Sequence, residues 1–376
     1  MLLDIESNLR SKLLDHFSDC GISSSNNLAL EYDKDRYRKA HFHQRSEKLN
    51  KNIDFVLNKW SSLSKFFASG SDISPEKIDV RLEVVQGGTI GSDLFRLASL
   101  YWSVPVSEGY GRRLRFLVWD KSNDKIIGIF ALGDAVFNIK SRDDFIGWTP
   151  QDRKERLVNV MDAYVVGAIP PYNTILGGKL VASLIKSLEV ADAFRKKYKN
   201  SVGLISGHKK NPYLTGVTLT SALGRSSVYN RLKLEGDWIF RKIGMTSGWG
   251  HFHVSDEIFR LMESYLKSIG DDHFSSYEFG GGPNWRIRVI KRALSSLGLS
   301  EKLMQHGYLR EVYFSDIAKN YDEILLGVKK IPDYSHLKNV SNITQEAKTR
   351  WVVPRSERFP EFIKYQREEL LKALLN

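Results

Sequence analysis

Hydrophobic residues in the middle of the chain form short runs that have the composition and spacing of β-strands. Such runs occur at 81–85, 113–118, 126–132, 158–169 and 217–221. The runs at 113–118 and 126–132 flank a turn at Asn123-Asp124, and this arrangement predicts an antiparallel hairpin. Residues 93–102 and 180–188 instead place apolar residues at helical spacing. The middle of the chain is therefore predicted to be an α/β unit.

Two further patterns complete the predicted architecture. Residues 238–243 and 251–254 flank the glycine-rich segment 246–250 and predict a second hairpin, with His251 and His253 on one face of its second strand. Helical spacing dominates the two ends of the chain. We therefore expect a helical N-terminal arm (1–75), an α/β core (76–255) and a mostly helical C-terminal region (256–376) with a short strand at 311–314.

A glycine-rich turn connects a predicted strand to a helix in the centre of the core. Pro170-Pro171 ends the strand, because proline has no backbone N–H to donate to a sheet. Gly177, Gly178 and Lys179 then begin the helix, where free backbone N–H groups can bind an anion. The alternative is a short connection whose glycines only permit close packing.

The charge distribution narrows the choice of partner. The net charge is +12, and residues 76–255 contain 26 Lys and Arg against 17 Asp and Glu, so this block carries +9 of it. A basic excess concentrated in one block favours a polyanion such as DNA as the partner. A basic enzyme with a well-solvated surface is the alternative.

The basic residues lie in loops that also contain aromatic residues. Cations neutralise phosphates and aromatic rings stack on bases, so these loops predict a nucleic-acid-binding cleft. The alternative is that the aromatic residues fill the core and the cations point separately to solvent. The candidate nucleic-acid-binding residues are Arg112, Arg113, Lys179, Lys209, Lys210, Arg225, Arg231 and Trp249.

Carboxylates and histidines offer candidates for catalysis. Asp162 interrupts an apolar strand, and a buried carboxylate there can act as a base. Together with Asp134 and Asp144 it can form a metal-dependent nuclease site, although loop aspartates more often cap turns. His251 is a third candidate, but the chain has no metal-ligand spacing that would support a zinc site. No Walker A or GxSxG motif occurs, so ATP hydrolysis and serine hydrolase chemistry are not expected.

The order of elements from 80 to 254 resembles the GNAT acetyltransferase superfamily. This resemblance implies a GNAT-like mixed, mostly antiparallel sheet. It also implies that Gly177, Gly178 and Lys179 hold the pyrophosphate of acetyl-CoA, and that Tyr229 is the general acid. The superfamily's Q/R-x-x-G-x-G/A pattern appears here only as Asn-Thr-Ile-Leu-Gly-Gly at 173–178, without the usual first residue and with adjacent glycines. We therefore expect no cofactor, and acetyl-CoA is the alternative.

Long segments of the chain resemble the DruA family of the Druantia anti-phage system. The segments lie at 111–138, 161–182, 220–234, 248–253 and 281–294, and the resemblance extends roughly from 75 to 326. It implies a role in bacterial defence beside other Druantia subunits, which include a large helicase. It implies no reaction.

Together these observations favour a cytoplasmic defence protein that binds DNA through its α/β core. The single cysteine, Cys20, suits a reducing compartment, and no apolar run approaches the roughly 20 residues of a membrane span. An acyltransferase, a nuclease and a non-catalytic scaffold for the helicase are the alternatives. Self-association, strand specificity and the phage trigger stay open.

Overall fold

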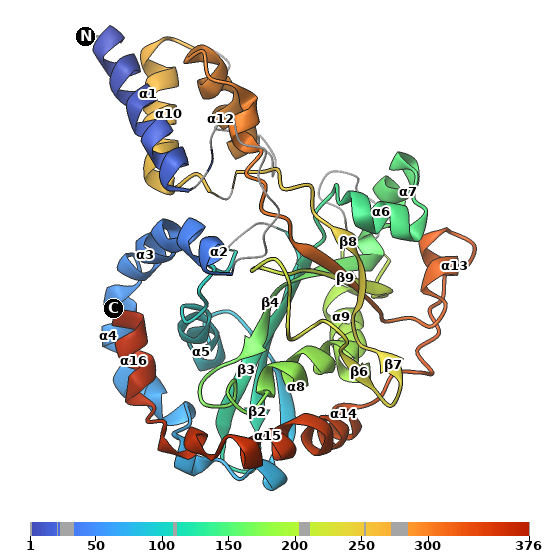
Figure 1. The fold of residues 1–376 in the computed structure, drawn as a ribbon. Helices are drawn as coiled ribbons and strands as arrows, with labels where there is room; N and C mark the ends of the chain where they lie inside the picture. The colour runs from blue at the N-terminus through green and yellow to red at the C-terminus, as the bar shows by residue number, and fades with distance from the viewer. Residues whose placement is uncertain are drawn as a thin grey trace.

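The centre of the protein is a seven-stranded mixed sheet. The computed structural model describes residues 2–20, 22, 34–107, 111–202, 211–251, 253–271 and 285–375. Its main sheet has the strand order β1-β2-β3-β4-β5-β9-β8 (Figure 1). β4 and β5 run parallel and the other neighbouring pairs run antiparallel, which confirms the predicted mixed, mostly antiparallel class. The strands are β1 (Val80–Val84), β2 (Arg113–Asp120), β3 (Lys125–Asp134), β4 (Val160–Ala168), β5 (Gly216–Thr220), β8 (Arg241–Met245) and β9 (Glu311–Asp316).

Helices cover both faces of the sheet. One face, which we call the α5 face, packs against α4 (Ile53–Leu63), α5 (Ile90–Ser99) and α16 (Glu368–Leu375). The other, which we call the α8 face, packs against α8 (Gly177–Ser183), α9 (Leu188–Tyr198) and α14 (Val340–Ala347). Alternate residues of the hairpin serve the two layers: Leu117 faces α5, whereas Phe116 faces α8. The hairpin is consequently apolar on both sides.

The sheet divides between β4 and β5. These strands pair only where 160–162 meet 216–218, and β4 continues to Ala168 beyond that point. The turns at 221–231 occupy the space that the division leaves. There, the Tyr229 hydroxyl donates a hydrogen bond of 3.0 Å to the carbonyl oxygen of Val166 in β4. The edge of β4 is therefore partly satisfied by a side chain in place of a strand.

Helices from both ends of the chain surround this core. α1 (Leu2–Asp19) packs with α10 (Asp256–Ser268) and α12 (Trp285–Ser296) in a projecting lobe, seen at the top of Figure 1. α2 (Lys34–Ala40), α3 (Phe42–Asn50) and α4 follow one side of the core, and α15 (Val353–Arg358) and α16 return along the bottom to α4. The lobe thus joins the first helix to helices of the C-terminal third.

The predicted hairpin at 238–254 is wrong. β8 pairs with β9, and His251 and His253 lie on bends and turns that precede α10. The glycine-rich segment hydrogen-bonds elsewhere: Gly250 N–H donates to the carbonyl oxygen of Met304 at 3.0 Å, and Gly307 N–H donates to that of Gly248 at 2.9 Å. The segment therefore docks on the loop before β9 and cannot turn the chain back onto β8.

Smaller corrections concern further local patterns. The composition of 134–148 and 329–348 predicts irregular structure, but these stretches contain α6 (Lys140–Ile146) and α14. The pattern at 224–232 predicts a short helix and that at 33–67 one long helix, but residues 224–232 form successive turns and residues 34–63 contain the three helices α2, α3 and α4. A strand is also predicted at 202–205, which falls mostly outside the described residues.

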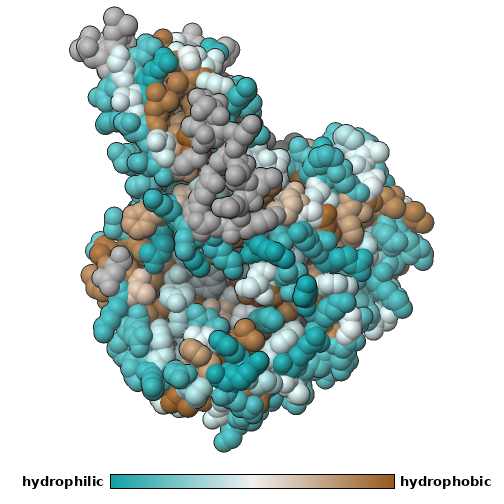
Figure 2. Space-filling view, viewed as in Figure 1, coloured by the Kyte–Doolittle hydropathy of each residue, from teal (hydrophilic) through white to brown (hydrophobic). Residues whose placement is uncertain are grey.

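The surface is largely hydrophilic on the face shown in Figure 2. Apolar side chains gather there at the edge beside α13 (Tyr321–Leu325), where Val328 and Ile331 are each 73 % exposed. None of the helices in the described part of the chain combines the length and apolar character needed to cross a membrane.

Candidate functional site

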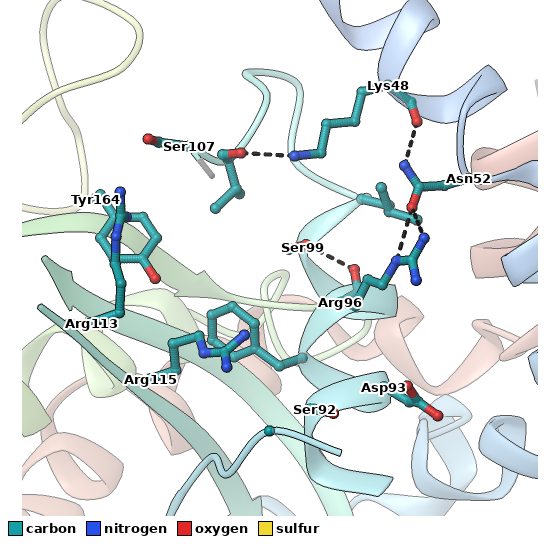
Figure 3. A pocket seen from close by; sticks show the side chains of 14 residues that line it. Lys48, Asn52, Ser92, Asp93, Arg96, Ser99, Ser107, Arg113, Arg115 and Tyr164 are labelled. Atoms are coloured by element: carbon teal, nitrogen blue, oxygen red, sulfur yellow. Dashed lines mark hydrogen bonds between the residues drawn. The ribbon is translucent and has the colours of Figure 1, made fainter. Parts of the chain in front are cut away.

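A cavity of about 530 Å³ lies on the α5 face of the sheet. The beginning of β2 and Tyr164 of β4 form one side, and α5, α3 and residues 106–107 form the other (Figure 3). The cavity is both basic and aromatic. Its lining includes the cations Lys48, Arg96, Arg113 and Arg115 and the rings of Phe95 and Tyr164.

Strand alternation brings Arg113 and Arg115 to this cavity and sends Arg112 elsewhere. Residues two apart on β2 share a face, so Arg113 and Arg115 both point toward α5. Arg112 instead stacks near the rings of Phe194 and Tyr198 on the α8 face, with its Nε 2.5 Å from Oδ1 of Asp134. Of the predicted pair Arg112 and Arg113, only Arg113 lines the cavity.

A β-bulge directs Tyr164 into the same space. Ala131 pairs with Val165 and Leu132 with Ala163, so Tyr164 is an extra residue in β4. The Arg113 guanidinium carbon lies 4.2 Å from the centre of the Tyr164 ring. Gly133, opposite Arg113 on β3, leaves room for this contact, because a Cβ there would lie 3.1 Å from Tyr164 Cδ1. The bulge and the glycine together position Arg113.

The opposite side of the cavity is held by a hydrogen-bond relay. Arg96 donates from Nε and Nη2 to Oδ1 of Asn52 at 2.9 and 2.7 Å, and its guanidinium lies 3.9 Å from the centre of the Phe55 ring. Asn52 in turn donates to the backbone carbonyl of Lys48, and Lys48 Nζ donates to the carbonyl of Val106 (Figure 3). These contacts orient Arg96 and Lys48 through uncharged partners.

The cavity carries little negative charge. Asp93 lines it, but its carboxylate pairs with Lys59 at 2.9 Å. Among the described residues, no carboxylate lies within ion-pair distance of Arg96, Arg113 or Arg115. Burial raises the pKa of Tyr164 despite the opposing influence of Arg113 and Arg115, so the phenol stays neutral. This arrangement suits an anionic ligand that also presents a flat ring.

The glycine turn lies on the other side of the sheet. Gly177 N–H already donates to the carbonyl oxygen of Tyr172 at 2.8 Å, and a Cβ on Gly177 would lie 2.6 Å from that oxygen. Gly178 has no neighbour closer than 4.0 Å to the position of a Cβ. Lys179 Nζ lies 5.4 Å from the centre of the Trp351 ring, and burial lowers its pKa with help from a nearby arginine. Gly177 therefore has a packing role, while Gly178 and Lys179 are less constrained.

Tyr229 is partly buried where the sheet divides. Its hydroxyl proton is engaged with Val166, and burial raises its pKa. Its ring packs edge-on against Phe240 and Tyr313. These contacts account for the residue as a structural element between β4 and β5.

Asp162 is the predicted catalytic residue with the most altered ionisation. Burial raises the pKa of its carboxyl to about 7, although Oδ2 accepts a hydrogen bond of 2.7 Å from Val136 N–H. The Thr218 hydroxyl of β5 donates to Oδ1. Asp162 therefore connects the last paired residues of β4 and β5, and its carboxyl keeps its proton to a higher pH than an ordinary aspartate.

The other predicted nuclease carboxylates each have a cation of their own. Asp134 pairs with Arg112 as described above, and Asp144 pairs with Lys140 at 2.7 Å on the exposed side of α6. In the ranges that the structure covers, no group of three or more His, Cys, Asp or Glu is placed to hold a metal ion. The structure thus does not assemble the three aspartates into a metal centre.

The remaining candidates that the structure describes do not line the cavity. Arg225 and Arg231 are exposed on the turns at 221–231. Trp249 is 43 % exposed with Lys291 Nζ 5.6 Å from its ring centre, and burial lowers the pKa of His251 to about 4. Lys209 and Lys210 lie outside the described residues.

Sequence reasoning missed Lys48, Arg96 and Arg115 as members of one basic site. The alternation in RLRFLV could have identified Arg115, since it is two residues after Arg113. Lys48 and Arg96 carry no comparable signal, because their approach depends on how α3 packs beside α5. Their contribution required the tertiary structure.

Comparison with known proteins places the chain in a family. A sequence model described as Druantia protein DruA matches residues 31–327. The curated Druantia protein DruA of Escherichia coli (strain UMEA 4076-1) is 47% identical over 374 residues, which are 99% of this chain and 93% of that protein. No solved structure matches the chain. The matched region includes every residue that lines the cavity. The chain therefore belongs to the DruA family of Druantia proteins and is a component of an anti-phage defence system.

Proposed function

We propose that this Druantia protein binds DNA through the basic cavity on the α5 face. The observation that carries the proposal is the convergence of Lys48, Arg96, Arg113 and Arg115 on a space whose only lining carboxylate among the described residues, Asp93, is paired with Lys59. Arg96, Arg113 and Arg115 have no ion-pair partner among the described carboxylates, and such cations attract phosphates and release the counterions around them. Tyr164, which is only partly buried, adds aromatic surface for a base.

The core that presents this cavity is GNAT-like in our proposal. Support comes from the order of elements and from the division of the sheet after three parallel pairs between β4 and β5. The same division argues against acyl-CoA as the ligand, because the Tyr229 hydroxyl already donates to the β4 carbonyl of Val166, which β5 does not pair. A cofactor would have to displace that partly buried side chain. DNA binding through the α5 face makes no such demand.

The partners follow from this proposal and from the family. As a Druantia component, the protein works beside other Druantia subunits. We propose that the large helicase is one of these subunits and that the DNA bound here is also its substrate. The helicase contact is a separate proposal, since the cavity by itself explains only the interaction with DNA.

The test is DNA binding as a function of salt concentration. The probe is a fluorescein-labelled 30-nucleotide DNA, titrated with the full chain at several KCl concentrations between 50 and 300 mM. Each neutralised phosphate contributes about −0.7 to −0.9 to the slope of log K against log salt. The variant Arg113→Gln/Arg115→Gln should therefore reduce the steepness of the slope by about 1.5 to 2.

A matched control removes two arginines that do not line the cavity. Arg260 and Arg358 are exposed on α10 and α15, and Arg260→Gln/Arg358→Gln removes the same net charge. This control should keep the wild-type slope. Equal losses in both double variants would show that net charge alone attracts DNA, and absence of binding at 50 mM KCl would refute the proposed function.

A further inference from the structure

We infer that the cavity takes one unpaired nucleotide at the end of a DNA strand, so that the protein prefers DNA with a single-stranded end to closed duplex. The inference rests on the proposed function and deepens it. The ligand that fits the cavity is a nucleoside monophosphate unit, which a strand end or a free nucleotide can supply. In this inference the strand end supplies it.

The first argument is size. A volume of about 530 Å³ falls in the range of roughly 300–1,000 Å³ that is typical of small-molecule sites. Such a space holds one nucleotide, whereas a duplex presents a surface with a groove about 12 Å wide that only a protruding element can enter. The cavity is concave, so it fits a group that enters it and not a surface that lies across it.

The second argument is the direction of the charges. Arg113 and Arg115 reach in from the sheet, while Lys48 approaches from α3 on the other side (Figure 3). Cations that enter one cavity from two sides can contact the same phosphate, and guanidinium groups can bind it through two parallel hydrogen bonds.

The third argument is preorganisation. The guanidinium of Arg113 is stacked 4.2 Å from the Tyr164 ring centre, and its Nε is buried without a hydrogen-bond partner. Arg96 is likewise ordered, because it donates two hydrogen bonds to Asn52. Side chains that are already ordered lose little entropy on binding a ligand.

The experiment compares two probes of the same duplex sequence. One is a dumbbell whose two ends are closed by hairpin loops, and the other has one loop replaced by a five-nucleotide single-stranded tail. We expect the tailed probe to bind about tenfold more tightly, which is the effect of one stacked nucleotide. Deoxyadenosine monophosphate at millimolar concentration should remove this preference by competing for the cavity.

Two variants connect the preference to the cavity. Arg113→Gln/Arg115→Gln should abolish the tenfold preference, whereas the control Arg260→Gln/Arg358→Gln should keep it. Gly133→Ala keeps every charge but places a Cβ 3.1 Å from Tyr164 and 3.3 Å from Nη1 of Arg113. It should therefore reduce the preference while the salt dependence of dumbbell binding stays unchanged.

The outcomes separate this inference from the proposed function. Tight binding of both probes with equal affinity would overturn the inference and leave DNA binding intact. Binding of the free nucleotide without any preference for the tailed probe would assign the cavity to a free nucleotide and would also overturn it. Failure of both DNA probes to bind at low salt would refute the proposed function and the inference together.

Discussion

Alanine substitution of the two adjacent glycines at the start of α8 should change the free energy of unfolding in opposite directions. Gly177 sits against the backbone of Tyr172: an added Cβ would lie 2.6 Å from its carbonyl oxygen and 3.1 Å from its carbonyl carbon. Backbone atoms cannot rotate away as a side chain can. Gly178, one residue later, has its nearest neighbours 4.0 Å from the same position.

The magnitudes follow from these two environments. Forcing a methyl group into a packed site costs about 1–3 kcal/mol, and at Gly177 the 2.8 Å hydrogen bond to Tyr172 would weaken as well. The gain from replacing glycine in a helix is about 0.5–1 kcal/mol and offsets part of this cost. Gly178→Ala has only the gain. The two variants should therefore differ by about 2–4 kcal/mol in unfolding free energy.

Urea denaturation followed by tryptophan fluorescence measures this difference. We expect the midpoint to fall for Gly177→Ala and to stay or rise for Gly178→Ala, with similar slopes for both transitions. Equal midpoints would refute the packing argument for Gly177. Loss of DNA binding in a stable Gly178→Ala variant would instead support the interpretation of this turn as a phosphate site.

Three further predictions concern buried polar groups. Burial lowers the pKa of His253 to about 3 and of His306 to about 2, so both are neutral in the folded state. Below pH 6.5 the unfolded state binds more protons than the folded state, so the free energy of unfolding should fall by roughly 1.5 kcal/mol per histidine between pH 6.5 and 5. Urea midpoints across this range should decline less steeply in His253→Phe, and an unchanged decline would contradict the assignment. For Asp162 the change of stability with pH has the opposite sign, because its pKa of about 7 in the folded state lies above the unfolded value. Its contribution to stability is present at low pH and should fall by about 2–3 kcal/mol as the pH rises from 5 to 8. Asp162→Asn should therefore be more stabilising at pH 8 than at pH 5, and a pH-independent effect would contradict this. Tyr229→Phe leaves the Val166 carbonyl without its donor and should cost about 1–3 kcal/mol in urea unfolding, whereas an unchanged midpoint would mean that the hydroxyl contributes nothing there.

The strands of the core could be predicted because each carries its own local signal. RLRFLV alternates, and the run at 126–132 is apolar on both faces because helices cover both sides of the hairpin. Pro170-Pro171 also marks the end of β4 correctly, since the strand stops at Ala168. Local patterns were sufficient wherever neighbouring segments of the chain pair with each other.

The pairing of β8 could not be predicted in the same way. Its true partner, β9, begins 66 residues after β8 ends, and the intervening helices α10 and α12 belong to the lobe with α1. The segment at 251–254 has the composition of a strand and is much nearer in sequence. Long-range packing decides whether β8 pairs with β9 or with 251–254, and a local sequence pattern does not report on such packing.

The cavity shows why a site can be partly visible in the sequence and still be misassigned. Adjacent arginines suggest a joint role, yet on a strand they must point to opposite faces, so Arg112 and Arg113 are separated by the sheet itself. The residues that do act together are two apart, as Arg113 and Arg115 are, or come from another layer, as Arg96 does. What positions them is a bulge at Tyr164 and the missing side chain of Gly133. Both are features of backbone register, and a change at Gly133 should therefore disturb the site as much as the loss of one of its charges.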